Sequence, residues 1–414
     1  MKKLALFLVC ASLAVGGAYA QKKLVGEVKK SVESMSANTK SLSDALNNIK
    51  PALTNAETAK DPEAWYVAGK AGFGLYDKYV AEKTLGKQVD LVAMGESLVT
   101  GYNYMMKAMP LDSILETEKD GSPKIDKKTG AKKYKTKYSK DIVNIVGGHH
   151  SDFMSAGNDL YDAKKYKKAG EAWGIYCELP RNPVYKKAIT LEVPDSVIGQ
   201  IRFFQAIAKW QDEDLQGAMF AFKEARKNGW KKKDVYDYEM SCAAQAQDEA
   251  RVVEVAKEAI PLFGQNDSQY VRIVINDMIN KQDFNGASAY LDDMLKQEPN
   301  NSEYNGLKGV LLEQEKKSDE ALAYFKKAVD CDPNNAKANF DYGRQFFNKA
   351  IRTMDQNPDL TGQKLLKVLA PIYQEGLPYL EKALQLDPDN TDCKNALKRI
   401  YYQLVDDQKL NALE

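Results

Sequence analysis

The chain of 414 residues carries 59 Lys and Arg against 58 Asp and Glu, which gives a formal net charge of +1. Such a balance creates no overall field that would draw the chain to nucleic acid or to a membrane surface. The length allows a large core or two to three ordinary domains, so the chain is not a small scaffold that depends on disulfides.

Residues 1–20, MKKLALFLVCASLAVGGAYA, have the pattern of a secretory signal peptide. Two lysines precede an apolar run, and the closing Ala-Tyr-Ala predicts cleavage before Gln21. Apolar sequence lies on both sides of Cys10, which does not fit a lipoprotein cysteine. We therefore expect an exported bacterial protein of the periplasm, where association with the outer membrane is one option.

Helical patterns fill most of the mature chain, beginning with capping helices within residues 21–61 that include SLSDALNNIKPAL. Residues 62–112 form the first repeat unit, in which Trp65 and Gly69 mark packing positions. A count from Trp65 predicts a small residue at position 88, whereas the small residue that fits is Ala108. Roughly 20 extra residues lengthen two paired helices by about two to three turns each, so we expect an enlarged unit.

Residues 113–140 interrupt the helical pattern. Two turn signals (DG and TG) and the alternation in KIDKKTGAKKYKT predict a β-hairpin or a mobile loop. From residue 119 to residue 140 there are nine Lys against two Asp, a net charge of +7. This charge fits a solvated segment, and it also fits a peripheral contact with an acidic partner or with anionic lipid at the envelope.

Residues 141–265 predict further helix pairs of the same kind. Phe153, Gly157 and Trp173 recur at matching offsets, and Phe222 follows in the next pair. The last pair of this segment keeps little beyond two helical stripes.

The clearest pair lies at the end of residues 266–335. Gly309 lets two predicted helices come close, Phe325 fills the space between them, and Pro333 ends the second helix. Pro299 precedes Pro333 by about 34 residues, a period that is typical of paired-helix repeats. The spacing therefore serves helix packing rather than a reactive site.

Residues 336–390 form a second enlarged unit. Gly343 lies one period after the glycine of the preceding unit, but Pro388 lies more than one and a half periods after Pro333. Residues 391–414, with TDCKNALKRIYYQL, predict the C-terminal capping helix that a solenoid requires.

These offsets resemble the tetratricopeptide repeat (TPR) family, whose pattern W-x2-L-G-x2-Y…A-x3-F…P recurs about every 34 residues. The resemblance covers most of residues 62–405. It implies an all-α fold, a right-handed α-solenoid of about six or seven TPR-like helix hairpins with the short lysine-rich β-hairpin or loop as an insert. The sequence departs from the pattern at Asn305, Lys308 and Ile275, which replace the usual Trp, Leu and Gly.

The first helix of each repeat has, beside its inward-packing face, a second face that could contact a partner. If its fourth, eighth and eleventh positions pack inward, the fifth, ninth and twelfth lie about 100° further round the helix. In the family that face lines a concave groove for partner peptides, so the resemblance implies a peptide-binding groove. The alternative is an exposed helix surface without a ligand. The groove positions are Tyr66, Lys70 and Phe73, then Met154, Asn158 and Tyr161, then Arg272, Asn276 and Ile279, and then Phe340, Arg344 and Phe347.

Some relatives hold a chain-terminal carboxylate with a cluster of basic and Asn side chains. Arg272, Asn276 and Lys337 match three of its five places, whereas Leu307 replaces an Asn and Asp341 replaces a base. The resemblance thus implies a broken carboxylate clamp.

Catalytic patterns are missing from the sequence. There is no HExxH, GxSxG, Walker-type or Gly-rich dinucleotide motif. The adjacent His149 and His150 cannot point the same way, so a helix-entry loop is favoured over a metal or acid–base site. We expect no enzyme activity, no cofactor and no bound metal.

The sequence therefore predicts a non-catalytic exported scaffold that binds a protein or peptide partner through the concave groove of a TPR solenoid. The alternative is an envelope module that binds glycan or cell wall, which would need exposed Trp or Tyr beside carboxylates. Trp65 and Trp173 fall at packing positions, which leaves Trp210 and Trp230. No nucleic-acid partner is expected, and the partner's identity and the oligomeric state stay open.

Overall fold

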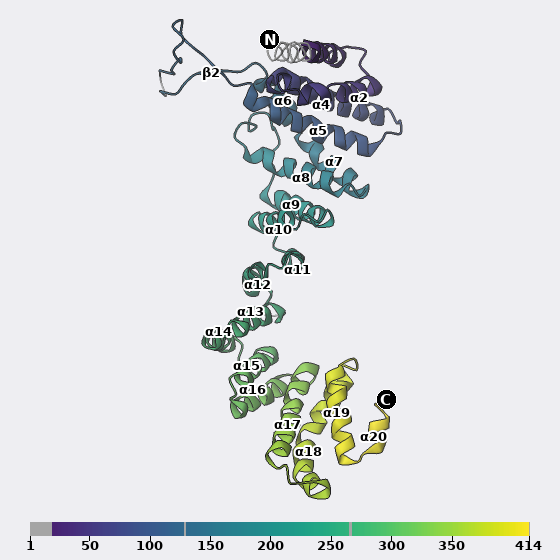
Figure 1. The fold of residues 1–414 in the computed structure, drawn as a ribbon, viewed down its shortest axis with the longest axis vertical. Helices are drawn as coiled ribbons and strands as arrows, with labels where there is room; N and C mark the ends of the chain where they lie inside the picture. Colours follow the sequence, from purple (N-terminus) through teal and green to yellow (C-terminus); the bar gives the residue numbers. More distant parts are fainter. Residues whose placement is uncertain (1–18, 128–129, 265–266, 414) are drawn as a thin grey trace, which may run out of the picture. The chain divides into compact units, whose positions relative to one another are not determined.

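The structure is a computed structural model that describes residues 19–127, 130–264 and 267–413 (Figure 1). Most of the predicted signal peptide, residues 1–18, lies outside the described residues. The described chain is mainly helical and contains one two-stranded antiparallel sheet, which confirms the predicted all-α fold with a short β-hairpin. Among the helices described, none is both long enough and apolar enough to cross a membrane.

The first compact unit comprises residues 1–248. In it, helices that follow one another in the chain pack side by side, and the described residues 19–32 form a helix before the numbered elements (Figure 1). Its elements are α2 (Thr39–Asn48), α3 (Lys50–Thr54), η1 (Thr58–Lys60), α4 (Pro62–Thr84), α5 (Leu91–Leu111), β1 (Ile114–Leu115), β2 (Tyr134–Lys135), α6 (Ser139–Gly148), α7 (His150–Asp162), α8 (Tyr166–Glu178), η2 (Leu179–Arg181), α9 (Asp195–Gln211), α10 (Leu215–Lys227) and α11 (Lys233–Gln245).

The second compact unit comprises residues 249–414. It begins within residues 141–265, for which the sequence pattern predicts one continuous segment of helix pairs. Its elements are α12 (Glu249–Phe263), α13 (Gln269–Asn280), α14 (Phe284–Gln297), α15 (Ser302–Gln314), α16 (Ser318–Cys331), α17 (Ala336–Gln356), α18 (Gly362–Leu386), α19 (Thr391–Leu404) and α20 (Asp407–Asn411).

Four long helices form two pairs. α4 and α5 have 23 and 21 residues, and α17 and α18 have 21 and 25. In comparison, α7 and α8 have 13 residues each. The long pairs lie within residues 62–112 and 336–390, where the residue count predicts enlarged units.

The lysine-rich insert, residues 113–140, is a hairpin with a fixed base. β1 pairs with β2, and two isolated bridges continue the pairing outward. At the base, the buried Asp112 carboxylate accepts hydrogen bonds of 2.7–3.0 Å from the backbone N–H groups of Lys137, Tyr138 and Ser139. Burial raises the pKa of Asp112, but these hydrogen bonds outweigh it and lower the pKa overall. Hydrogen bonds to Asp112 therefore hold the base of the hairpin against the helices.

The turn between the two helices of a pair repeats one backbone conformation. In five turns a non-glycine residue has φ between 57° and 63°, in the left-handed region. From the second turn onward these residues recur about every 34 residues, so the backbone repeats with the predicted period. In two turns the next residue, Asp214 or Asp283, caps the following helix by accepting a backbone hydrogen bond at 2.9 Å. The five left-handed residues are Lys164, Glu213, Gln247, Gln282 and Lys316.

Small residues allow the helices of a pair to approach each other, as α15 and α16 demonstrate. A Cβ atom placed on Gly309 would lie 2.7 Å from two ring atoms of Phe325, closer than atoms in contact can come. Phe325 is fully buried. Its ring thus occupies the space that the glycine leaves, as the sequence predicts.

We expect Gly309→Leu to lower the free energy of unfolding of the second unit by about 1–3 kcal/mol, because the larger side chain must displace the Phe325 ring. Gly306→Leu is the matched control in the same helix, since a Cβ atom there would meet nothing within 4 Å. Urea unfolding followed by circular dichroism measures both variants. Equal stability of the two would contradict the packing role of Gly309.

Candidate binding groove

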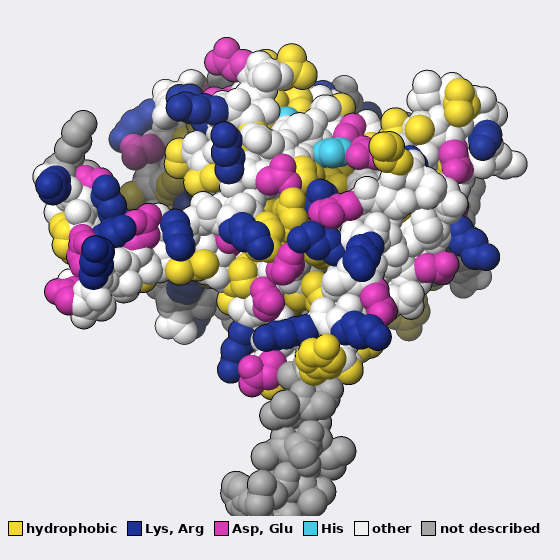
Figure 2. Space-filling model, turned by 90° about the horizontal axis from the view of Figure 1, so that it is seen from above, with side chains coloured by type: hydrophobic (Ala, Val, Ile, Leu, Met, Phe, Trp, Pro, Cys, Tyr) yellow, Lys and Arg dark blue, Asp and Glu magenta, His cyan; other side chains and the backbone are white. Residues whose placement is uncertain are grey.

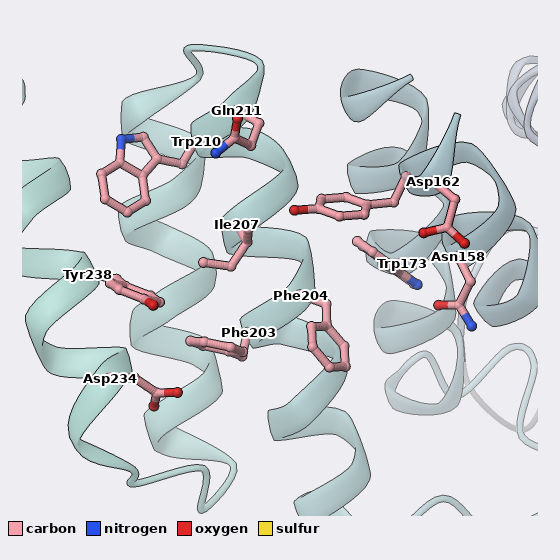
Figure 3. Close-up of a pocket in the computed structure, with 11 residues that line it drawn as sticks. Asn158, Asp162, Trp173, Phe203, Phe204, Ile207, Trp210, Gln211, Asp234 and Tyr238 are labelled. Atoms are coloured by element: carbon pink, nitrogen blue, oxygen red, sulfur yellow. The ribbon is translucent and has the colours of Figure 1, made fainter. Parts of the chain in front are cut away.

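A groove of about 790 Å³ lies within the first unit, where α7, α8, α9 and α11 approach one another (Figure 3). α9 contributes more of the lining than any of the other three helices. Its residues Phe203, Ile207 and Trp210 are four and three residues apart and share one helix face. The lining residues are Asn158, Tyr161, Asp162, Trp173, Phe203, Phe204, Ile207, Trp210, Gln211, Asp234 and Tyr238.

Aromatic rings run through the groove in an unbroken series. Each ring centroid lies 5.6–6.1 Å from the next, a spacing typical of aromatic contacts. Phe204 and Tyr238 are 37% and 41% exposed, so the series offers ring surface to a partner. This aromatic series consists, in order, of Tyr161, Trp173, Phe204, Phe203, Tyr238 and Trp210.

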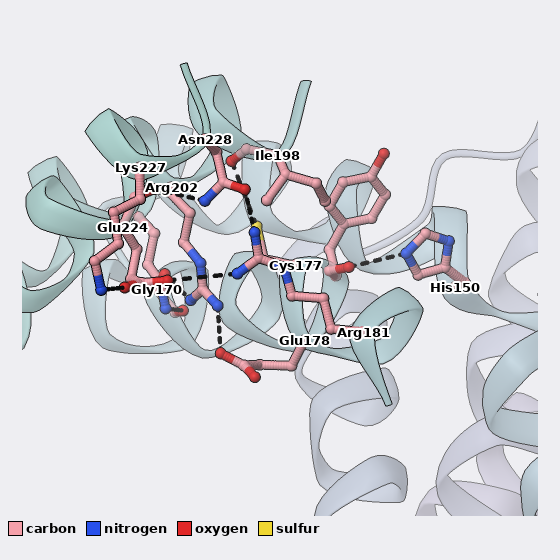
Figure 4. A network of polar contacts seen from close by, with 12 residues as sticks. His150, Gly170, Cys177, Glu178, Arg181, Ile198, Arg202, Glu224, Lys227 and Asn228 are labelled. Atoms are coloured by element: carbon pink, nitrogen blue, oxygen red, sulfur yellow. Dashed lines mark hydrogen bonds and ion pairs between the residues drawn. The ribbon is translucent and has the colours of Figure 1, made fainter. Parts of the chain in front are cut away.

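A polar network centred on the buried Arg202 and Gln205 side chains fixes α9 through a different face of the helix (Figure 4). The Arg202 guanidinium donates to the Gln205 side chain at 2.7 Å and also to the Glu178 carboxylate. Gln205 in turn donates to the Gly170 carbonyl at 3.0 Å. Because Glu178 and Gly170 belong to α8, the network holds α9 against α8 and so orients the aromatic face of α9.

A buried ion pair fixes α11. Arg226 of α10 pairs with Glu239 of α11, and their side chains are only 4% and 0% exposed. The Arg226 guanidinium also lies 5.0 Å from the ring centroid of Tyr236. Since α11 carries Asp234 and Tyr238, this pair sets where those two groove residues lie.

The polar side chains of the groove are acidic or neutral. Among the described residues that line it, Asn158, Asp162, Gln211 and Asp234 are polar, and none is Lys or Arg. The Oδ1 atom of Asp234 is buried and has no hydrogen-bond partner within the described part of the chain. The groove is therefore both aromatic and acidic.

Some predicted groove residues of the first unit lie in or near this groove. Asn158 and Tyr161 line it. Met154 is half-buried, and its carbonyl accepts a hydrogen bond from Trp173 Nε1 at 3.2 Å. Lys70 is half-buried on α4, away from the groove lining.

Two predicted groove residues on α4 are not available to a partner. The Tyr66 ring stacks on Tyr138 with centroids 4.4 Å apart, and its hydroxyl donates to the Asp141 carboxylate. The Phe73 ring lies 4.9 Å from the His149 ring. Both side chains are buried, because α6 and the residues at its two ends cover this face of α4. α6 is an additional helix that the repeat pattern does not contain, so the positional rule fails here.

Three predicted residues of the second unit come together. Phe340, Arg344 and Phe347 of α17 line a pocket of about 400 Å³ with side chains of α19 that include Arg399. Arg344 donates to Glu313 at 2.9 Å, so part of its charge is already neutralised.

The other predicted residues of the second unit lie on α13 and at the start of α17. Arg272 and Asn276 are exposed on α13, and Ile279 is half-buried there. Lys337 donates to the buried Asp341 carboxylate at 2.5 Å. Asp341 therefore neutralises the lysine that a carboxylate clamp would use and adds a negative charge beside it.

Sequence reasoning missed the groove residues of α9. Counting positions back from the left-handed turn residue places Phe203, Ile207 and Trp210 at the fifth, ninth and twelfth positions of this helix. Arg202 and Lys209 occupy the inward fourth and eleventh positions, where an apolar or aromatic residue is usual. The repeat was therefore recognised in α10 but not in α9.

The two histidines contact separate groups and do not converge on one site. His149 Nε2 lies 2.9 Å from Asp77 Oδ1, and His150 Nε2 lies 2.9 Å from the Tyr176 carbonyl oxygen. Burial lowers the pKa of His150. Burial also acts to lower the pKa of His149, but hydrogen bonds to Asp77 and to the Ile145 carbonyl outweigh it and raise the pKa. The described residues contain no cluster of three potential metal ligands.

Helix pairs with a recurring turn, and a groove along their first helices, define an α-solenoid protein. Residues 279–336 of the second unit match the tetratricopeptide repeat family model. This matched segment therefore carries the tetratricopeptide repeat that the sequence pattern predicts. This fold is typical of scaffolds for protein interaction and is generally non-catalytic. No curated protein matches the chain.

Several solved structures resemble the chain. A TPR repeats protein from Bacteroides fragilis is 14% identical, with 61% of this chain and 98% of that chain covered and a TM-score of 0.33. The C-terminal part of a TPR repeat-containing protein from Cytophaga hutchinsonii is 17% identical, with 63% and 92% covered and a TM-score of 0.34. The TPR2AB domain of yeast Sti1, in its pHSP90 complex, is 15% identical, with 81% and 97% covered and a TM-score of 0.24.

Proposed function

We propose that the protein is a non-catalytic scaffold that binds a segment of another protein in the groove of its first unit. The observation that carries this proposal is the aromatic series, which presents ring surface along a groove lined by α7, α8, α9 and α11. Aromatic side chains supply large apolar contact area at a low cost in side-chain entropy, which is why they dominate many binding surfaces.

The anchoring of the groove supports the same proposal. Trp210 is half-buried and its indole N–H donates to the Gln245 side chain at 2.7 Å, so its ring is held in place before a partner arrives. The Arg202 network and the Arg226–Glu239 pair likewise fix the helices that carry the rings. A partner therefore has little ordering of the groove to induce, which favours affinity.

Two thiols in the described part of the first unit, Cys177 and Cys242, also fit a non-catalytic role. Burial raises the pKa of Cys177 to about 12 and that of Cys242 to about 11. A thiol with such a pKa is protonated at neutral pH and is a poor nucleophile.

Site-specific photocrosslinking in living cells tests the proposed groove. A benzophenone amino acid at Gln211, an exposed lining residue, should give a covalent adduct with a discrete partner. The same group at Phe220 is the control, because Phe220 is 57% exposed on α10 and does not line the groove. Equal adducts from both positions would contradict a binding role for the groove.

The purified partner then allows a quantitative test by calorimetry. We expect Trp210→Ala to weaken its binding by about tenfold or more, as for an anchor residue at a protein interface. Phe220→Ala should leave the affinity unchanged. Wild-type affinity of the Trp210 variant would rule out the aromatic series as the contact surface.

We also propose that the protein is exported and that its lysine-rich hairpin makes a peripheral, salt-sensitive contact at the cell envelope. Two hairpin lysines are paired within the hairpin, Lys124 with Glu116 at 3.2 Å and Lys133 with Asp126 at 3.8 Å. On the face shown in Figure 2, basic side chains are interspersed with acidic ones, so any such contact is local. The mass of the protein isolated from cells tests cleavage before Gln21. Envelope fractionation of a hairpin variant with lysines replaced by serines, at low and high salt, tests the contact.

A further inference from the structure

We infer that the groove recognises a basic linear segment, one in which a lysine or arginine lies between apolar side chains. This inference rests on the proposed binding function and specifies its ligand. The juxtaposition that carries it is a series of aromatic rings with two acidic side chains, Asp162 and Asp234, on different helices of the same groove.

Neither carboxylate is neutralised within the described part of the chain. Asp162 is exposed and makes no ion pair there. Asp234 also makes no ion pair there, and its buried Oδ1 atom has no hydrogen-bond donor. A partly buried carboxylate without a partner is costly, and a cationic side chain from a ligand would supply the missing opposite charge at the accessible part of the Asp234 carboxylate.

No lysine lines the groove, and the lysines closest in sequence to Asp234 have partners of their own. Lys232 lies over the Trp230 ring, with Nζ 4.2 Å from the centroid, and Lys233 is paired with Asp237 at 2.7 Å. Next to the aromatic face of α9, Lys209 is paired with Asp214 at 2.6 Å. These three lysines therefore contact other groups, and the groove lining itself carries two negative charges and no positive one.

The position of Asp162 increases the negative potential at one end of the groove. It lies in the last turn of α7, where the partial negative charge of the helix terminus adds to that of the carboxylate. Tyr161, next to it, opens the aromatic series. A cation between a ring face and a carboxylate gains both interactions at once, since the ring face is itself negative.

The apolar part of the segment follows from the rest of the lining. Ile207 and the rings of the aromatic series form an apolar surface that a single basic side chain is too small to cover. Apolar residues on either side of the basic one would cover that surface, which gives affinity, while the carboxylates select the charge. A segment with a glutamate at that position would bring like charges together and should be rejected.

Matched peptides test the inference with the full-length protein. Three fluorescent peptides share one phenylalanine-rich sequence and carry arginine, citrulline or glutamate at the central position. Citrulline has nearly the shape of arginine but no charge, so the comparison isolates the cation. We expect the arginine peptide to bind about tenfold more tightly than the citrulline peptide, and the glutamate peptide to bind most weakly, as fluorescence anisotropy would measure.

Two groove variants connect that preference to the carboxylates. Asp234→Asn and Asp162→Asn should each reduce the preference for arginine over citrulline to about threefold or less while leaving the citrulline affinity unchanged. Asp212→Asn is the control, because this exposed carboxylate follows α9 but does not line the groove. Melting curves establish that each variant is folded, and either groove variant alone suffices for the test.

The outcomes separate the inference from the proposed function. If citrulline and arginine peptides bind equally well, the cation preference is wrong and the groove remains a peptide site. If the glutamate peptide binds best, the assigned charge is wrong. If no peptide binds at millimolar concentration, the basic segment is overturned, and crosslinking at Gln211 still decides whether the groove binds another partner.

Discussion

Glu239→Ala should lower the free energy of unfolding of the first unit by about 3–5 kcal/mol, because it removes the carboxylate that pairs with a buried guanidinium. The Arg226 side chain is only 4% exposed and cannot reach bulk water without opening the packing of α10 against α11. Hydrogen exchange of α10 and α11 measures the loss within the first unit, without interference from unfolding of the second.

Two controls identify the origin of that effect. The double variant Arg226→Leu/Glu239→Leu should lie much closer to the wild type in stability, because apolar side chains can replace a buried ion pair at little net cost. Asp237→Ala breaks the pair with Lys233 on the surface of the same helix and should change stability by about 0.5 kcal/mol or less. A small loss for Glu239→Ala, equal to that of Asp237→Ala, would contradict the buried-charge explanation.

Gly72→Ala should destabilise the first unit by about 3 kcal/mol or more, although alanine is normally the better helix former. At this position α4 and α5 meet backbone to backbone. An added Cβ atom would lie 2.6 Å from the Gly101 Cα atom and 2.9 Å from the Ser97 carbonyl oxygen. No side-chain rotation relieves such a contact, so the two helices must move apart.

Gly74→Ala is the matched control for Gly72→Ala. It lies two residues further along α4, where a Cβ atom would meet only the Leu42 side chain at an ordinary 3.6 Å. Alanine should therefore stabilise the helix there by up to about 1 kcal/mol. Thermal unfolding of both variants measures the difference. A Gly72 variant that melts like the Gly74 variant would show that α4 and α5 do not approach as closely as described.

The repeating part of the fold was predictable from sequence, because two of the helix pairs use the same contact between a glycine and an aromatic ring. Gly157 with Trp173 and Gly309 with Phe325 are such contacts, and the spacing of these residues identifies both helices of each pair. The division after residue 248 was not predicted, because the turn at Gln247 keeps the spacing of the turns before and after it.

The binding groove was only partly predictable, for two physical reasons. On α4, the positional rule placed Tyr66 and Phe73 on the expected face of the helix, but α6 and the residues at its ends cover that face. Because α6 does not belong to the repeat, the repeat spacing could not predict this cover. On α9, the buried Arg202 replaces the apolar residue that marks the inward face. The same arginine that helps to orient the aromatic face therefore breaks the apolar pattern by which that face would be recognised.

The path of the aromatic series has a consequence for cooperativity. In an array of helix pairs, each pair is stabilised mainly by its immediate neighbours, so the pairs can open one at a time. The series passes from α7 through α8 and α9 to α11, and a bound segment would touch all of them. Its binding free energy would then be lost whenever any one of these helices separated from the others. A bound segment would thus make the local unfolding of these helices cooperative, whereas without it they would unfold almost independently.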